Sequence, residues 1–219
     1  MKIKVLYEDK DILAVDKPSG LLVHPDQRGK EETILEIFLK KYPKLEIVHR
    51  LDRDTSGVIL LAKNKKAHKF LKIQFANRDV KKIYHAIVSG EIKKDHEIIN
   101  KPIGRSPRDF RRWLAGRGAR GELREAITEY KVLKRFKAPV PFTYLEVKPK
   151  TGRTHQIRVH KKYINHPVVC DSLYNPDAPC PKGITRLALH AKSIEFKNLK
   201  DKIIKVESPL PVSFKKVVK

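Results

Sequence analysis

The feature that most constrains the fold of this chain is the grouping of its strand-like segments. Residues 2–9 and 12–18 read as two strands joined by a short charged turn. Residues 127–136 and 142–149 have strand-like patterns on either side of "KAPVP" and predict a hairpin. A parallel sheet would need a long crossover between such neighbours. We therefore expect an α+β fold with a mixed, largely antiparallel central sheet and flanking helices.

Helix-like segments lie between these groups. Apolar residues recur at helical spacing in residues 31–43, 65–79 and 154–165, and Pro43 ends the first of them. Further strand-like segments are 81–92, 186–196 and 203–211. A length of 219 residues suffices for one large domain or two small ones. Since we find no internal repeat and no Ser/Gly-rich linker, we expect a single domain over residues 1–219.

The charge of the chain points to a polyanionic partner. Lys plus Arg number 49 and Asp plus Glu 25, which gives a formal net charge of +24. An anionic membrane is the alternative partner, but the sequence shows no basic amphipathic helix, no lipidation signal and no apolar run of about 18 residues. The start is too charged for a signal peptide. Nucleic acid is therefore favoured, although a thermophilic origin would also account for part of the Lys content.

The cysteine and histidine content argues against a disulfide scaffold and against a metal site. Cys170 and Cys180 are the two cysteines, and so few fit a reducing compartment, which favours a cytoplasmic protein. The nine histidines are scattered, without a HExxH pattern. We expect no metal and no cofactor, with a Cys170/Asp171/Cys180 cluster left open as an alternative.

Residues 104–124 differ from the rest of the chain, because they are rich in Arg and Gly, poor in apolar residues, and hold the single Trp. The segment is too long for an ordinary connection. One interpretation is a disordered basic tether. We favour a mobile loop that grips RNA, since guanidinium groups pair with phosphates and both they and Trp113 can stack on bases.

Three motifs carry the chemistry: "HRLDRDTSG" at 49–57, "KKIYHAIVSG" at 81–90 and "KTGRTHQIRVH" at 150–160. Taken alone, the first could be an ordinary turn held by local hydrogen bonds. In this order and spacing the three resemble the motifs of the RluA-type pseudouridine synthases. The segments "DKDILAVDKPSGLLVHP" and "RLALHA" resemble the same family, so that the resemblance covers nearly the whole chain.

Two residues depart from the family pattern in the turn "NHPVVCDSLYN". Asn165 and Cys170 each stand where the family usually has Gly. Asn tolerates a left-handed backbone, whereas Cys tolerates it less well, so we expect the backbone at Cys170 to differ. The small N-terminal RNA-binding domain of some relatives is expected to be absent, which leaves RNA binding to the catalytic domain.

The resemblance implies an RNA pseudouridine synthase fold and activity without a cofactor. It makes Asp52 the nucleophile, Arg158 the guanidinium that keeps Asp52 ionised, and Tyr84 the ring that stacks on the uracil. Whether Asp52 attacks the sugar or the base stays open. Arg50 would help to fill the space left by the flipped nucleotide. The expected RNA-binding residues are Arg50, Arg105, Arg108, Arg111, Arg112, Trp113, Arg153 and His155.

Other residues of the 49–57 loop have simpler expected roles. Asp54 and Thr55 are predicted to hydrogen-bond the loop backbone, and His49 to be structural. The expected function is isomerisation of specific uridines in ribosomal or transfer RNA, by a cytoplasmic monomer. Two alternatives are a non-catalytic RNA-binding protein of the same fold and a base-flipping glycosylase.

Overall fold

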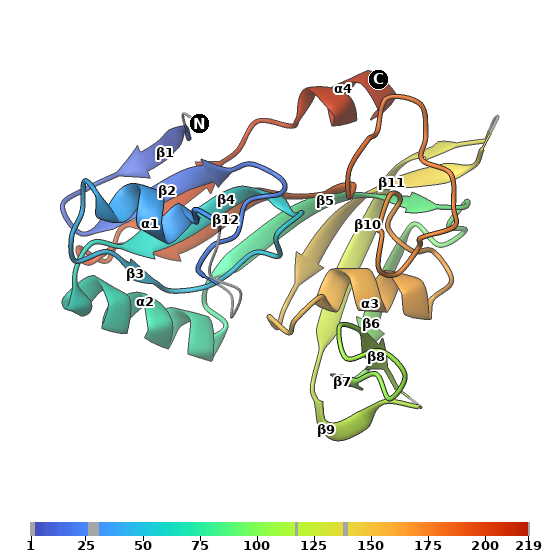
Figure 1. Cartoon of the computed structure of the whole chain (residues 1–219), viewed down its shortest axis with the longest axis horizontal. Helices are drawn as coiled ribbons and strands as arrows, with labels where there is room; N and C mark the ends of the chain where they lie inside the picture. The colour runs from blue at the N-terminus through green and yellow to red at the C-terminus, as the bar shows by residue number, and fades with distance from the viewer. Residues whose placement is uncertain (1–2, 26–30, 117, 138–139, 219) are drawn as a thin grey trace. The chain divides into compact units, whose positions relative to one another are not determined.

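The computed structural model describes residues 3–25, 31–116, 118–137 and 140–218. The chain forms two compact units, each with its own core. The first unit consists of Met1–Lys82 and His190–Pro209, and the second of Ile83–Leu189 and Leu210–Lys219. Both are built on mostly antiparallel strands with few helices, so the predicted α+β class is confirmed (Figure 1).

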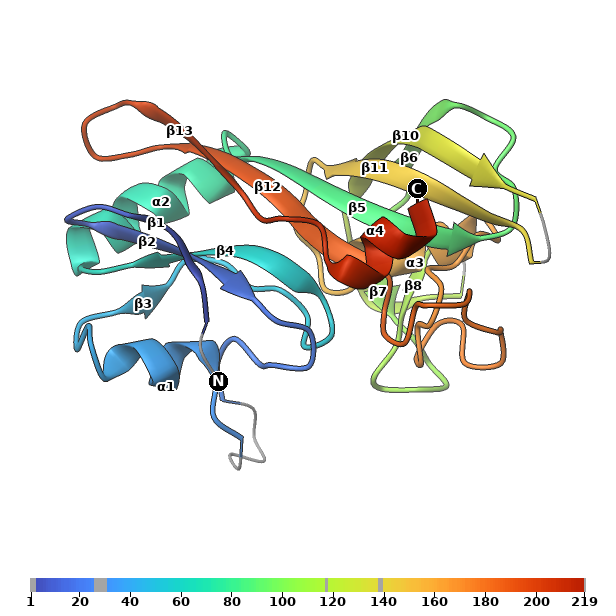
Figure 2. The ribbon, with the colours of Figure 1, turned by 90° about the horizontal axis from the view of Figure 1, so that it is seen from above.

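The first unit has a mixed sheet in the order β1-β2-β4-β12. β2 pairs antiparallel with β1 and β4, whereas β4 and β12 run parallel. β13 forms an antiparallel hairpin with β12, which Figure 2 shows, and β3 pairs with β4. The strands are β1 (Val5–Glu8), β2 (Ile12–Lys17), β3 (Glu46–Ile47), β4 (Ser56–Ala62), β12 (Leu189–Lys197) and β13 (Ile203–Glu207).

Two helices flank this sheet and begin at side-chain caps. Helix α1 (Ile34–Leu39) starts with a capping box, in which Thr33 and Glu36 satisfy each other's backbone amides. Helix α2 (Lys65–Asn77) is capped by Asn64. It buries Ala67 and Leu71 in the core that includes β4. The helical spacing of the sequence therefore predicted both helices.

The second unit holds an antiparallel sheet in the order β5-β11-β10-β6. Helix α3 (Gln156–Tyr163) packs near β10 and β11, and α4 (Val212–Val218) buries Phe214. The predicted hairpin of residues 127–149 is confirmed as β10 and β11. The strands are β5 (Lys81–Ser89), β6 (His96–Asn100), β10 (Ile127–Phe136) and β11 (Phe142–Pro149).

The basic segment contains strands and forms a folded arm, where we expected a loop. Its strands β7 (Ile103–Arg105), β8 (Trp113–Ala115) and β9 (Arg120–Arg124) form a separate sheet in the order β8-β7-β9. We call residues 103–116 and 118–124 the arm. Ile103 and Ala115 pack with Val159 of α3, which gives the arm an apolar anchor that its composition did not reveal. Figure 1 shows the strands of the arm beneath α3.

Two expectations about the cysteines were wrong. Cys170 and Cys180 form a disulfide, whereas the composition favoured reduced thiols. Cys170 also adopts the left-handed backbone of the Gly that it replaces, with φ 55°, as does Asn165 with φ 61°. The disulfide joins the Cys170 side chain to Cys180, ten positions later, and so restrains the turn that contains Cys170.

Candidate active site

The 49–57 loop is held by the segment that follows β2. The ammonium group of Lys17, which has no solvent exposure, donates to the carbonyl oxygens of Arg53 at 2.6 Å, Leu21 at 2.6 Å and Pro18 at 2.9 Å. Ser19 donates to the carbonyl of Asp54 at 2.6 Å. These bonds fix the backbone immediately after Asp52, so the nucleophile predicted from the motif lies on a rigid turn.

Gly57 shows why the motif ends in glycine. Its φ is +111°, and a Cβ built there would lie 2.2 Å from the carbonyl oxygen of Ala191. Gly57 and Ala191 are partners in the parallel pairing of β4 with β12. Any side chain would push these strands apart. The Gly of the motif thus brings the loop directly into the sheet.

His49 is a structural residue, as expected. Its Nε2 accepts a hydrogen bond from the Leu60 amide at 2.9 Å, and its ring stacks on Phe75. Burial, together with the charges of Lys82 and Lys72, lowers the pKa of His49 to about 3. The ring is therefore neutral at physiological pH and does not act as a proton carrier there.

Hydrogen bonds of Thr55 differ from the prediction. Its amide donates to the carbonyl of Asp52 at 3.1 Å, but its hydroxyl is buried without a partner among the described residues. The loop backbone is held instead by Lys17 and Ser19, which lie more than 30 positions earlier. Asp54 contributes its carbonyl oxygen as the acceptor for Ser19.

Arg158 is a buried residue of α3 and not a surface one. Only 6% of it is exposed, and its Nε and Nη2 donate to the two carboxylate oxygens of Asp171 at 2.7 and 2.8 Å. Burial alone would raise the pKa of Asp171, but the bonds from Arg158 outweigh it and hold this pKa below its usual value. The fork-to-fork geometry fixes the orientation of the guanidinium plane.

Tyr174 links this ion pair to the arm. Its hydroxyl accepts a hydrogen bond from the Trp113 amide at 2.9 Å and lies 3.0 Å from Nδ1 of His155. The Arg158 guanidinium lies over its ring, 5.1 Å from the centroid. The amide of Tyr174 donates to Asp171 at 3.0 Å. The arm and the ion pair therefore share one buried tyrosine.

The start of α3 explains the residues "TGRTHQ". Gln156 accepts hydrogen bonds from the Thr151 hydroxyl and the Arg153 amide, and donates to the Ile127 carbonyl and the Thr128 hydroxyl. His155 precedes the helix in a left-handed conformation, with φ 54°. These bonds attach α3 to β10 and so determine where Arg158 lies.

The predicted catalytic residues come from both units. Asp52 is a partly exposed residue of the first unit, directly after the exposed Arg50 and the buried Leu51. Tyr84 and Arg158 belong to the second unit. Tyr84 is partly exposed in β5, opposite Val147 of β11, and packs against the core of its unit.

Five of the predicted RNA-binding residues lie together on the arm. The Arg105 guanidinium stacks on Trp113, 4.4 Å from the ring centroid. Asp109 pairs with Arg111 at 2.9 Å and with Arg112 at 3.4 Å. The arm residues are Arg105, Arg108, Arg111, Arg112 and Trp113. The other three are Arg50 of the first unit and Arg153 and His155 of the second.

Sequence reasoning missed Lys17, Asp171 and Tyr174. Lys17 is the last residue of an apolar strand. A charged residue in a buried strand is rare unless it is paired, so this position could have been predicted to hold a structural or functional charge. Asp171 and Tyr174 lie in the turn compared with the family, where Asp171 was considered only as a member of a metal cluster and Tyr174 received no role. The open alternative of a metal at Cys170, Asp171 and Cys180 finds no support, since the described residues contain no group of three suitable ligands.

Comparison with known proteins places the chain in a family. A family model described as RNA pseudouridylate synthase matches residues 11–163. Ribosomal large subunit pseudouridine synthase D of Xanthomonas campestris is 36% identical over 99% of this chain and 68% of that protein. An uncharacterized RNA pseudouridine synthase of Aquifex aeolicus is 44% identical over 84% of this chain, and the match spans 60% of that relative.

Solved structures agree with this result. The human RNA pseudouridylate synthase domain containing 1 protein aligns with a TM-score of 0.81 at 28% identity, over 96% of this chain and 84% of that one. The chain therefore belongs to the RNA pseudouridine synthase family, a class of isomerases that act on RNA. The family predicted from the motifs is confirmed. No helix within the described ranges is long and apolar enough to span a membrane.

Proposed function

We propose that this protein converts uridine to pseudouridine in ribosomal RNA, with Asp52 as the nucleophile. The observation that carries the proposal is the Asp52 loop, which combines the family motif with a backbone fixed by Lys17 and Ser19. Ribosomal RNA is the proposed substrate because relatives named as ribosomal large subunit pseudouridine synthases match nearly the whole chain. Transfer RNA is a second substrate implied by the sequence resemblance.

The reaction breaks the bond from the sugar C1′ to N1 of uracil and forms one from C1′ to C5. C5 loses a proton and N1 gains one, so the product is an isomer and no oxidant or water is consumed. An ionised carboxylate can hold the reacting fragment during the rotation of the base. We assign that role to Asp52, and leave the attacked atom as either C1′ or C6.

Arg158, Tyr84 and Arg50 have supporting roles in this proposal. Arg158 balances the charge of the Asp52 carboxylate, and Asp171 keeps its guanidinium in one orientation. Tyr84 stacks on the uracil and assists in removing the proton from C5. Arg50, which is an exposed residue of the 49–57 loop, occupies the space that the flipped nucleotide leaves.

The remaining proposals concern RNA binding, domain organisation and cellular location. The arm and the residues near α3 bind the RNA backbone, because their guanidinium groups match phosphate geometry. We propose one catalytic domain that acts as a cytoplasmic monomer, without a cofactor. The net charge of +24 supports RNA as the partner.

Release of tritium from RNA labelled at C5 of uridine tests the proposal. The wild-type protein should release tritium from ribosomal RNA, and Asp52→Asn should reduce the rate to background because no carboxylate remains to form the covalent bond. Loss of acid–base assistance alone costs roughly 10²–10⁴-fold, so an Asp52→Asn protein that retains more than about a hundredth of the rate contradicts the assignment.

Asp54→Asn is the matched control, since it removes the same charge two positions away and leaves the Asp54 carbonyl bonded to Ser19. We expect it to retain activity. Circular dichroism and RNA binding establish that both variants are folded. A non-catalytic RNA-binding protein would release no tritium, and a glycosylase would leave abasic positions at which the strand can be cut.

A further inference from the structure

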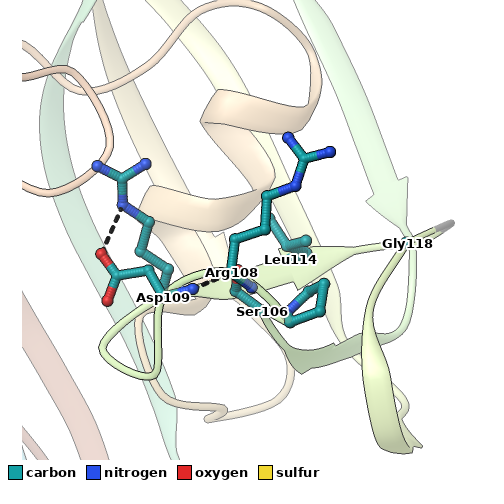
Figure 3. Close-up of a pocket in the computed structure, with 7 residues that line it drawn as sticks. Ser106, Arg108, Asp109, Leu114 and Gly118 are labelled. Carbon is teal, nitrogen blue, oxygen red and sulfur yellow. Dashed lines mark hydrogen bonds and ion pairs between the residues drawn. The ribbon is translucent and has the colours of Figure 1, made fainter.

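The arm contains a pocket that the proposed chemistry does not use. It has a volume of about 370 Å³ and lies between the turn that follows β7 and the strand β8. The side chains of Pro107, Leu114, Arg108 and Arg112 are among its lining, and the lining is mostly apolar. Figure 3 shows Arg108 and Leu114 among the residues around it. A volume of this order falls within the range of small-ligand sites.

The turn that lines the pocket is formed by its own hydrogen bonds. The Ser106 amide donates to the Arg112 carbonyl at 3.0 Å, and the Arg112 amide donates to the Asp109 carbonyl at 2.9 Å. The Ser106 hydroxyl accepts from the amides of Arg108 at 3.3 Å and Asp109 at 3.4 Å. The pocket is therefore largely formed before a ligand arrives, which lowers the entropic cost of binding.

Charge in this turn is organised by Asp109. Its carboxylate receives two hydrogen bonds from the Arg111 side chain, at 3.1 and 2.9 Å, and pairs with Arg112 at 3.4 Å. One carboxylate thus pairs with two arginines, Arg111 and Arg112, whereas no ion pair of the described residues joins it to Arg108. Since the acidic group is already paired, the excess positive charge is available to an anion.

Aromatic surface lies beside the pocket. Phe110, at the tip of the turn, is 77% exposed, which is unusual for so large an apolar side chain. Trp113 begins β8 and carries the Arg105 guanidinium on its ring. An exposed ring next to guanidinium groups is the combination with which proteins bind single-stranded nucleic acid.

The arm is anchored to its unit, so a ligand in the pocket would be held at a fixed position. The Trp113 amide donates to the hydroxyl of Tyr174, which is 4% exposed. The same tyrosine contacts the Arg158 guanidinium. A single buried side chain thus connects the strand that lines the pocket with the arginine assigned to the reaction.

From these contacts we propose that the arm pocket binds one unpaired nucleotide of the RNA substrate, at a place separate from the uridine that reacts. The base lies against Leu114 and Pro107, and its phosphate is bound by Arg108 and Arg112. The inference rests on the proposed function only in taking RNA as the ligand. It makes the protein selective for RNA that carries an unpaired nucleotide in addition to the target uridine.

Binding of short RNAs tests this proposal directly. The probes are a single-stranded hexanucleotide of uridines with one 4-thiouridine, and a fully paired RNA duplex with the same number of phosphates. We expect the hexanucleotide to bind more tightly than the duplex at equal salt. Irradiation should cross-link the 4-thiouridine to residues 106–114, as identified by mass spectrometry of the peptides.

Filling the pocket should abolish this preference. Leu114→Trp should weaken binding of the hexanucleotide about tenfold, in keeping with the loss of one stacked base, and leave duplex binding unchanged. The matched control is Leu123→Trp, which enlarges an exposed leucine of the same arm that does not line the pocket. It should bind both RNAs like the wild type.

A second pair of variants covers the case in which Leu114→Trp does not fold. Arg108→Ala with Arg112→Ala should weaken hexanucleotide binding more than Arg120→Ala with Arg124→Ala, although both pairs remove two charges from the arm. Equal losses in both pairs, or cross-links that map outside the arm, would overturn the proposal. Tighter binding of an acidic peptide of equal charge than of the hexanucleotide would overturn it as well.

Tritium release separates this inference from the proposed function. Leu114→Trp should raise KM for ribosomal RNA and leave kcat close to the wild-type value, since the pocket does not touch the reacting uridine. If the wild-type protein binds the hexanucleotide as described but releases no tritium, the proposed function is refuted and the proposed nucleotide pocket stands. If Leu114→Trp has the kcat and the KM of the wild type, the proposed nucleotide pocket is refuted and the proposed function stands.

Discussion

The buried ammonium group of Lys17 is one of the donors that fix the backbone beyond Asp52. Lys17 donates to three carbonyl oxygens, one of which belongs to Arg53 in the 49–57 loop. Hydrogen bonds to a charged donor contribute about 1.5–3 kcal/mol each before the cost of burying the charge. These bonds therefore oppose movement of the loop.

Lys17→Met should reduce turnover more than it reduces stability. The apolar chain of methionine fills similar space, but Arg53 loses a donor and the loop gains freedom. We expect tritium release to fall at least about tenfold in kcat, because misplacement by about 1 Å can cost 10²-fold. Lys63→Met is the control, since Lys63 also bonds a backbone carbonyl, that of Asp9. Equal kcat values for the two variants would contradict this role.

The Arg158–Asp171 pair makes stability depend on pH. The pKa of Asp171 is lowered in the folded protein, so its contribution is present above the unfolded pKa near 4 and is lost as pH falls through the folded value. Asp171→Asn removes the carboxylate that accepts two hydrogen bonds from the buried Arg158. We expect a loss of about 3–5 kcal/mol in the free energy of unfolding at pH 7.

Urea unfolding of Asp171→Asn and of the wild type at several pH values measures this effect. The difference between them should shrink as the pH falls below 4, because the wild-type carboxyl becomes protonated too. Asp95→Asn is the control, since it removes an exposed carboxylate that pairs with Arg135 and should change stability little. A difference that stays constant with pH would show that the charge of Asp171 is not responsible.

At the scale of elements, the sequence predicted those parts whose pattern is local. The helices α1 and α2 and the hairpin of β10 and β11 follow from periodicity and caps. The strands of the arm escaped prediction because β7 and β8 have three residues each, too few to show a period. Helix α4 also escaped, since it follows directly on the segment 203–211 that was interpreted as the last strand.

For the candidate site, too, the sequence predicted only what lies within a local motif. The motifs gave candidate residues on the loop, on β5 and on α3, since each lies within a continuous stretch of sequence. The partners of those residues lie elsewhere in the chain: Arg53 is 36 positions from Lys17, and Arg158 is 13 from Asp171. Contacts of this kind depend on tertiary packing, which no local pattern contains.

The arm should account for a measurable part of the salt dependence of RNA binding. Each phosphate contact contributes about −0.7 to the slope of log affinity against log salt on single strands. Changing Arg108, Arg111 and Arg112 to Ala should therefore make the slope shallower by about 2. Changing Lys200, Lys202 and Lys205, which are exposed in the first unit, removes the same charge and should alter the slope less. Equal changes of the slope in the two triple variants would mean that the arm contributes no more to RNA binding than other basic surface.

At the scale of the whole molecule, a net charge of +24 opposes the compact state by self-repulsion. Many of the exposed acidic groups are already paired, as Glu207 is with Lys192 and Lys205. The surplus is therefore basic surface without enough acidic partners on this chain. A bound polyanion removes that repulsion and adds its own binding energy to the folded state.

RNA should therefore stabilise the folded protein, and salt should remove the effect. At low ionic strength we expect ribosomal RNA to raise the Tm, because only the folded protein arranges its cations on the binding surface. At about 1 M salt the Debye length is about 3 Å, so the Tm values with and without RNA should converge. Differential scanning fluorimetry measures both, with equal phosphate supplied as inorganic phosphate for the control. A rise in Tm that persists at 1 M salt would show that stacking and not charge dominates the binding.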